Sequence, residues 1–113
     1  DHASSLGRNE PDAGMLRRLQ ANTVLNYARK GRGGIFWSAA DTRGANPLDL
    51  AERAAVKWPD YFRPWLGRIS ELREADFIGI VERVPADWMS AMQKIFCLRF
   101  LCVTHSELKK LPR

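Results

Sequence analysis

The segment between Ser90 and Lys110 constrains the fold most, because its apolar residues cover most sides of a helix. Asp87 or Ser90 can provide the N-cap, and we expect the helix to end at about Lys110. A helix that is apolar on most sides is usually enclosed by other elements. The segment therefore predicts a bundle of helices packed around this one. One side carries Met92, Ile95, Phe96, Phe100 and Val103, and the other carries Leu98, Leu101 and Cys102.

The first part of the chain predicts one long helix between two loops. Residues 1–11 read as a loop, and Asp12 can cap a helix that runs to about Arg29. Residues 30–34 (Lys-Gly-Arg-Gly-Gly) end that helix, because closely spaced glycines favour positive φ angles and tight turns. Residues 35–37 (Ile-Phe-Trp) can form a brief extended piece before a further loop. The face expected to be buried carries Leu16, Leu19, Thr23 and Tyr27.

A strong helix start follows at Asn46. Asn46 is a favourable N-cap, Pro47 suits the first helical position, and Asp49 in the first turn complements the helix dipole. Pro59 is expected to end this helix. Its inner face would consist of Ala51, Ala54, Ala55 and Trp58.

Two short helices complete the prediction. Pro64 can open the first, in which Trp65, Ile69 and Leu72 share a face, and the second spans about Glu74 to Val84 before Pro85. No segment shows the alternation of a strand. The sequence therefore predicts an all-α fold, a compact bundle of four to five helices that forms a single domain over residues 1–113.

Composition and cysteine placement narrow the class of protein. The chain is 45% hydrophobic and 27% charged, which is typical of a globular domain. Its longest apolar run, residues 95–103, is interrupted by Arg99 and is about half of what a membrane span needs. Cys97 and Cys102 lie on different faces of one predicted helix and cannot pair, so we interpret them as core thiols in a reducing compartment, the cytoplasm.

Charge and tryptophan content leave two alternatives open. The net charge is +5, but basic and acidic residues are interleaved, which favours a solvated surface over a patch that faces nucleic acid. The four tryptophans could stack on bases, although Trp58 and Trp65 lie on apolar faces and are expected to fill gaps between helices.

The motifs that carry chemistry are sparse. The glycines after Lys30 match neither the Walker A loop nor the dinucleotide fingerprint, which leaves a turn and a minor alternative in which Arg32 touches a phosphate. Asp1, His2, Ser4 and Ser5 are too close in sequence to converge as a catalytic triad, so we assign no catalytic residue. Asp1 alone could hold Mg²⁺ against phosphate oxygens, with a plain turn aspartate as the alternative.

Five segments, in order, carry a family resemblance. They are Asp1-His2-Ala3-Ser4-Ser5-Leu6-Gly7-Arg8, Arg32-Gly33-Gly34-Ile35-Phe36-Trp37, Gly44-Ala45-Asn46-Pro47-Leu48, Pro59-Asp60-Tyr61-Phe62-Arg63-Pro64-Trp65 and Arg83-Val84-Pro85-Ala86-Asp87-Trp88-Met89-Ser90. Together they resemble the C-terminal region of HipA-like serine/threonine kinases of the toxin–antitoxin type. The resemblance covers nearly the whole chain. It departs in the last helix, at Thr104-His105-Ser106-Glu107.

The resemblance implies a fold, a cofactor and partners. The chain would be the C-terminal helical lobe of a kinase-like fold, and the loop 1–11 would carry Asp1 as the aspartate that holds Mg²⁺ on ATP. The phosphate loop, the nucleotide-anchoring lysine and the catalytic Asp and Asn lie upstream in the family and are not in this chain. The lobe would therefore be inactive and bind neither Mg²⁺ nor ATP alone. Its partners would be the N-terminal kinase half and an antitoxin-like protein.

Two functional hypotheses therefore stand. The first is the helical lobe of a HipA-like kinase, in which Ile35-Phe36-Trp37 would be an apolar surface that faces the other half. The second is a stand-alone basic helical module that binds nucleic acid or a partner protein. Neither involves a membrane. A degenerate remnant without activity is the third alternative.

Overall fold

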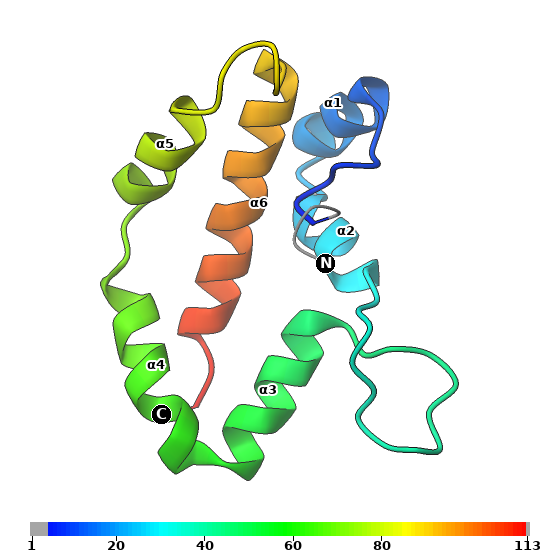
Figure 1. Cartoon of the computed structure of the whole chain (residues 1–113), viewed down its shortest axis with the longest axis vertical. Helices are drawn as coiled ribbons and strands as arrows, with labels where there is room; N and C mark the ends of the chain where they lie inside the picture. The colour runs from blue at the N-terminus through cyan, green and yellow to red at the C-terminus, as the bar shows by residue number, and fades with distance from the viewer. Residues whose placement is uncertain (1–4, 113) are drawn as a thin grey trace.

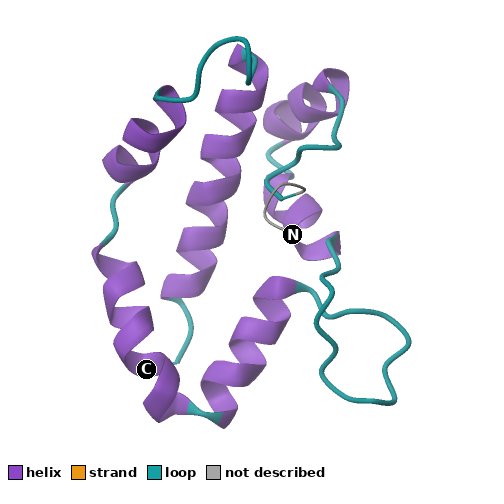
Figure 2. Cartoon of the chain, viewed as in Figure 1, coloured by secondary structure: helices purple, strands orange, loops and turns teal. Residues whose placement is uncertain are grey.

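The computed structural model describes residues 5–112 and folds them into six α-helices (Figures 1 and 2). No strand occurs in this part of the chain, so the all-α prediction is confirmed, with one helix more than expected. The helices are α1 (Asp12–Ala21), α2 (Val24–Lys30), α3 (Pro47–Lys57), α4 (Pro59–Glu71), α5 (Glu74–Glu82) and α6 (Ala91–Lys109).

Helix α6 is the centre of the bundle, as its apolar character predicts. It contacts each of the other five helices, and Figure 1 shows α4 and α5 on one side of it and α1 and α2 on the other. Its Phe96 is fully buried and meets the ring of Tyr27 edge to face, with ring centroids 5.6 Å apart. Of the two predicted caps, Ser90 is the one used: its hydroxyl accepts from the Gln93 N–H, and the Gln93 side chain accepts from the Ser90 N–H.

The single helix expected over residues 12–29 is wrong, because the chain breaks at Asn22. Asn22 adopts the left-handed conformation (φ 56°, ψ 44°), which asparagine tolerates better than most residues. The Thr23 N–H then donates to the Arg18 carbonyl at 2.9 Å, so the end of α1 is capped by a turn. The break lets α1 and α2 follow different directions across α6.

The boundaries around α4 also differ from the prediction. Pro59 does end α3, but it also opens α4, since Trp58 is the C-cap of one helix and the N-cap of the next. The Trp58 carbonyl accepts from the Tyr61 and Phe62 N–H groups. Pro64 therefore lies inside α4 and does not open a helix. Because Pro64 has no N–H, α4 lacks one backbone hydrogen bond, the one to a carbonyl in its first turn.

The segment before α1 is fixed on the core. Leu6 and Gly7 both have positive φ angles, 57° and 82°, and Gly7 packs against the ring of Phe96. A Cβ at Gly7 would lie 2.5 Å from Cε1 of Phe96, so only glycine fits. Among the described glycines this is the one with a positive φ, so the positive φ angles expected at residues 31–34 are not found.

Candidate functional site

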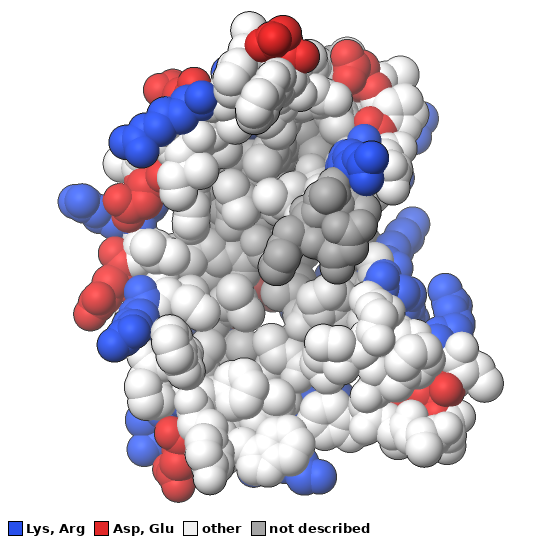
Figure 3. Space-filling model, in the orientation of Figure 1, with Lys and Arg blue, Asp and Glu red and all other residues white. Residues whose placement is uncertain are grey.

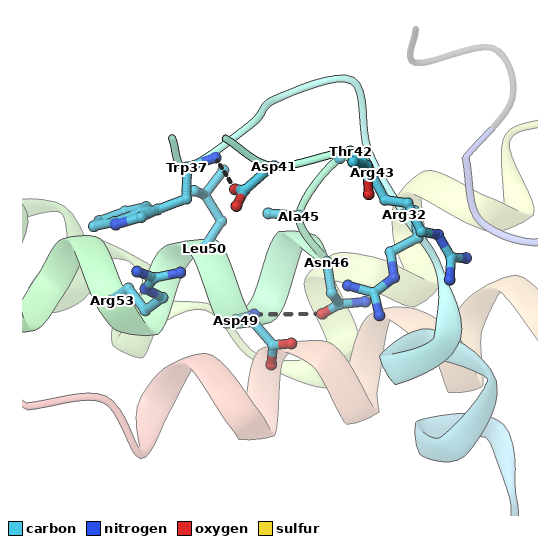
Figure 4. A pocket seen from close by; sticks show the side chains of 11 residues that line it. Arg32, Trp37, Asp41, Thr42, Arg43, Ala45, Asn46, Asp49, Leu50 and Arg53 are labelled. Atoms are coloured by element: carbon cyan, nitrogen blue, oxygen red, sulfur yellow. Dashed lines mark hydrogen bonds between the residues drawn. The ribbon is translucent and has the colours of Figure 1, made fainter. Parts of the chain in front are cut away.

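The long loop between α2 and α3 borders an open cavity of about 330 Å³ at the start of α3 (Figure 4). We call it the arginine cavity, because three guanidinium groups line it: those of Arg32, Arg43 and Arg53. Figure 4 shows Arg32 and Arg43 close together at the loop end and Arg53 beside Trp37 at the other end. The remaining lining residues are Trp37, Asp41, Thr42, Gly44, Ala45, Asn46, Asp49 and Leu50.

Backbone hydrogen bonds close the loop and preform the cavity. The Gly33 N–H donates to the Ala45 carbonyl at 2.9 Å, and the Ala45 N–H donates to the Ile35 carbonyl at 2.7 Å. Gly44 is buried against the Gly33 backbone, where any Cβ would clash with the Gly33 carbonyl oxygen. The extended piece expected at residues 35–37 is thus part of a closed loop, and the side chains of Ile35 and Phe36 are exposed, as expected.

Asn46 joins this loop to two helices. Its side-chain oxygen accepts from the Leu48 and Asp49 N–H groups at 3.0 and 3.3 Å, so the predicted N-cap is confirmed. Its amide NH₂ donates to the Ala28 and Gly31 carbonyls at 2.8 and 2.6 Å. One buried side chain therefore provides hydrogen-bond partners for the free N–H groups at the start of α3 and for the free carbonyls at the end of α2.

The charges of the cavity are unevenly paired. Asp49 accepts from Arg29, which lies outside the cavity, at 3.0 Å. Asp41 accepts from the Trp37 and Ser38 N–H groups at 3.1 Å each and so holds the loop. Within residues 5–112, Arg32, Arg43 and Arg53 form no ion pair with a carboxylate. The guanidinium groups of Arg32 and Arg43 remain available to an anion, and that of Arg53 lies over the Trp37 ring.

Three large aromatic side chains follow one exposed face of the chain from the end of α3 along α4. We call them the aromatic stripe: Trp58, Tyr61 and Trp65, which are 44%, 76% and 61% exposed. Their spacing of three and four residues places them on one side of the helix. The expectation that Trp58 and Trp65 fill gaps between helices is therefore wrong, and Leu66 is the residue of α4 that is buried.

Cations lie over the rings of this surface. Arg53 lies 4.1 Å from the ring centroid of Trp37, Lys57 lies 5.1 Å from that of Trp58, and Arg68 lies 5.1 Å from that of Trp65. Such contacts favour fixed ring orientations. The ring centroids of Trp37 and Trp58 are 5.9 Å apart, so the arginine cavity and the aromatic stripe are continuous.

A second, more apolar cavity of about 560 Å³ lies beside the segment that precedes α1. Trp88, 78% exposed, stands at its edge, and the buried Cys97 lies in its wall. The other lining residues are Ser5, Leu6, Gly7, Arg8, Met15, Val84, Met89 and Gln93. This cavity shares no residue with the arginine cavity.

The cysteines lack the setting of reactive thiols. Both are free, and burial raises the pKa of Cys97 and of Cys102 above the ordinary value. Catalytic cysteines have lowered pKa values, because the thiolate is the nucleophile. The interpretation as a core thiol fits Cys97, which is buried, whereas Cys102 is only half-buried.

The predicted metal residue cannot be located. Asp1 lies outside the described residues, as do His2 and Ser4. Within residues 5–112 no three His, Cys, Asp or Glu side chains gather as a metal site. His105 contacts the Ile69 carbonyl through Nε2 at 2.7 Å and packs edge to face on Phe77.

An ion-paired junction ties α2, α3 and α6 together. Arg29 binds Asp49 and Glu107, each at 3.0 Å, and Glu107 also accepts from Lys110. The hydrogen bond from Lys110 lowers the pKa of Glu107 most, burial opposes it, and Arg29 lowers it further. Glu107 is therefore most stabilising as a carboxylate.

None of the helices described here has the length and apolar character needed to cross a lipid bilayer. Comparisons with protein-family models, with curated proteins and with solved structures find no match to this chain.

Of the three arginines that line the arginine cavity, the sequence analysis identified one as a possible phosphate contact and missed the other two. It raised Arg32 as a phosphate contact, but Arg43 and Arg53 are 11 and 21 residues further along the chain. Only the closure of the loop by Gly33 and Ala45 brings Arg43 close to Arg32, and Arg53 lines the opposite end of the cavity (Figure 4). The sequence did contain a signal for such a closed loop. An Arg-Gly-Gly sequence precedes an apolar run, and an Asn-Pro helix start follows it.

Proposed function

We propose that the chain is the C-terminal helical lobe of a HipA-like serine/threonine protein kinase. In the intact protein it would support ATP-dependent phosphotransfer, and alone it would be inactive. Asp1 would hold Mg²⁺ on the ATP phosphates, the upstream half would supply the phosphate loop and the catalytic base, and the protein would act in the cytoplasm. An antitoxin-like protein would be a further partner.

The observation that carries this proposal is the anchoring of the segment that follows Asp1. Gly7 packs on Phe96 at the centre of α6, and its φ of 82° admits no other residue without strain. The Glu10 side chain then pairs with Arg18 of α1 at 3.5 Å. A metal-binding aspartate needs a rigid support, because phosphotransfer depends on positioning. The anchored turn at Leu6 and Gly7, a few residues further along the sequence than Asp1, suits that role.

The apolar cavity beside this turn also supports the proposal. It opens next to Trp88 and Met89, and Trp88 is largely exposed for a residue of its size. Exposed apolar surface of this kind often marks a contact with another domain. A lobe that docks on a catalytic half would cover it.

The first test is to sequence the coding DNA upstream of Asp1. We expect the reading frame to continue through a loop with a catalytic Asp and a downstream Asn, and to reach Pro-x-aromatic immediately before Asp1. A start codon directly before Asp1 would contradict the kinase proposal. Phosphotransfer by the 113-residue chain alone would contradict it as well, since no catalytic base is assigned in this sequence.

The second test uses the product of the whole reading frame. Asp1→Asn should reduce phosphotransfer from ATP to background without changing the unfolding temperature, because Asn is a poorer ligand for Mg²⁺. Asp12→Asn is the matched control, since Asp12 is exposed in the first turn of α1 and has no expected role in metal binding. Equal activity of the two variants would remove Asp1 from the site.

A further inference from the structure

We propose that the arginine cavity and the aromatic stripe form one binding surface for single-stranded nucleic acid. A backbone phosphate enters the cavity beside Arg32 and Arg43, Arg53 lies over Trp37 at the end nearer the stripe, and bases stack on the exposed rings of α4. This binding is independent of phosphotransfer.

The cavity has the charge and the size for a phosphate group. Its three guanidinium groups come from two different elements, the loop and α3: Arg32 and Arg43 lie together at one end of a volume of about 330 Å³, and Arg53 lies beside Trp37 at the other (Figure 4). Guanidinium groups bind phosphate oxygens with paired, charge-assisted hydrogen bonds. Both carboxylates of the cavity are already engaged, Asp49 with Arg29 and Asp41 with the loop backbone. Arg53 lies over the Trp37 ring, and no carboxylate within residues 5–112 pairs with Arg32 or Arg43.

The loop that carries Arg32 and Arg43 is preorganised. Two backbone hydrogen bonds close it, and Gly44 permits the close approach to Gly33. Asn46 fixes its end to α2 and α3. A closed loop loses little further conformational entropy when it binds a phosphate, so the cavity can contribute affinity directly.

The aromatic stripe begins where the cavity ends. Trp37 lines the cavity and lies 5.9 Å from Trp58, and the exposed rings continue along α4 to Trp65. Cations lie over these rings, at 5.1 Å for both Trp58 and Trp65. In Figure 3 the lower part of the molecule, over α3 and α4, is mostly uncharged, with both basic and acidic residues at its edges.

This combination favours single strands over duplexes and over acidic proteins. Proteins that bind single strands combine cationic grooves with rings on which bases stack, and every base offers a ring face. A duplex hides its base faces and leaves the stripe unused. An acidic protein would use the cations but gain little from three exposed rings in a row.

The experiment measures binding of a labelled oligothymidylate of about twelve nucleotides to the 113-residue chain by fluorescence anisotropy. Trp65→Ala should weaken binding at least about fivefold, the loss expected for one stacked base. Arg43→Gln should weaken it and reduce the slope of log K against log salt by about 0.7, the value for one phosphate contact in a single strand. A duplex of the same length should bind more weakly than the single strand.

Two control variants match these changes. Trp88→Ala removes an exposed tryptophan at the edge of the other cavity, and Arg17→Gln removes an exposed arginine of α1. Neither should change the affinity for the oligonucleotide by more than about twofold, since neither touches the proposed surface. Circular dichroism of all four variants checks that the helices are kept.

Several results overturn the proposal. The absence of oligonucleotide binding does so, as does binding that all four variants weaken equally or that a duplex matches. Binding of a polyglutamate peptide with the same dependence on Trp65, and without binding of the oligonucleotide, would assign the surface to an acidic protein. None of these results bears on the kinase proposal, which depends on Asp1 and the upstream reading frame.

Discussion

Replacement of Asn46 by alanine tests how the loop and the helices hold together. Asn46 is 1% exposed and makes four hydrogen bonds with one side chain. Asn46→Ala removes the N-cap of α3, which costs about 1 kcal/mol. It also removes the Asn46 amide donor from the Ala28 and Gly31 carbonyls, at about 1 kcal/mol each; the Ala28 carbonyl keeps only the long bond from the Gly31 N–H, at 3.4 Å. We expect a total loss of about 3 kcal/mol, a large share of the ~5–15 kcal/mol typical of a domain.

The measurement is urea unfolding followed by far-UV circular dichroism, with the free energy extrapolated linearly to water. Asn46→Ser separates the two contributions. Serine caps a helix about as well as asparagine, but its short side chain cannot reach the two carbonyls, so this variant should recover about 1 kcal/mol. The slope against urea should stay unchanged in both variants, because the folded surface is the same.

Asn26→Ala is the matched control, since Asn26 is exposed on α2. It should change the unfolding free energy by less than about 0.5 kcal/mol. The reasoning is refuted if Asn46→Ala also falls within that range. Asn46 would then not connect α2 with α3, and the preorganisation of the arginine cavity would lose its basis.

Two further variants test the centre of the bundle and its ion-paired junction. Phe96→Ala should lower the unfolding free energy by about 3–5 kcal/mol, because Phe96 is fully buried and packs against Gly7 and Tyr27. Urea unfolding measures this loss. A loss below ~1 kcal/mol would contradict the central place of Phe96. The lowered pKa of Glu107 predicts stabilisation that is present above about pH 4.5 and lost as the pH falls through the folded pKa. Glu107→Gln should therefore be less stable than wild type near neutral pH, and its stability should approach that of wild type in acid. Urea unfolding across that pH range measures the difference. A difference that does not vary with pH would contradict the stabilising role of the Glu107 carboxylate.

Local signals in the sequence predicted two of the helix starts. Asn46 was identified as an N-cap and Ser90 as one of two candidates, because a cap depends on hydrogen bonds within a few residues and hardly on the rest of the fold. Asp12 was expected to cap α1, but the N-cap is Pro11 and Asp12 is the first helical residue. The central place of α6 was also predictable, since a helix with apolar residues on most sides must be covered by neighbours. These features depend on the chain's own local chemistry.

The breaks inside helices were less predictable. Asn22 turns the chain into the left-handed region, but asparagine also occurs within helices, so the residue alone does not reveal a break. Pro64 reads as a helix start, yet α4 accommodates it in its interior. In both cases packing against α6 decides between conformations of similar local energy, and the sequence pattern does not contain that packing.

The prediction that Trp58 and Trp65 are buried between helices was wrong for a related reason. Helix α4 has two apolar sides, one with the buried Leu66 and one with the aromatic stripe, and periodicity does not tell which side faces the core. The arginine cavity could not be predicted as a whole either. It exists only because Gly33 and Ala45 pair across a loop and bring Arg32 near Arg43.

The residues that carry the kinase proposal lie apart from the aromatic stripe, and only Trp37, which the sequence analysis places toward the other half, also lines the arginine cavity. The turn anchored by Gly7 and the apolar cavity with Trp88 lie next to α1 and α6, whereas the aromatic stripe follows α4 on the far side of α6 (Figure 1). Sites without shared residues couple weakly. In the product of the whole reading frame, Trp65→Ala should therefore weaken binding of single strands and leave phosphotransfer unchanged, and Asp1→Asn should do the reverse. If both variants affected both activities, the strand would bind across the two lobes, and the stripe would belong to the site of the kinase.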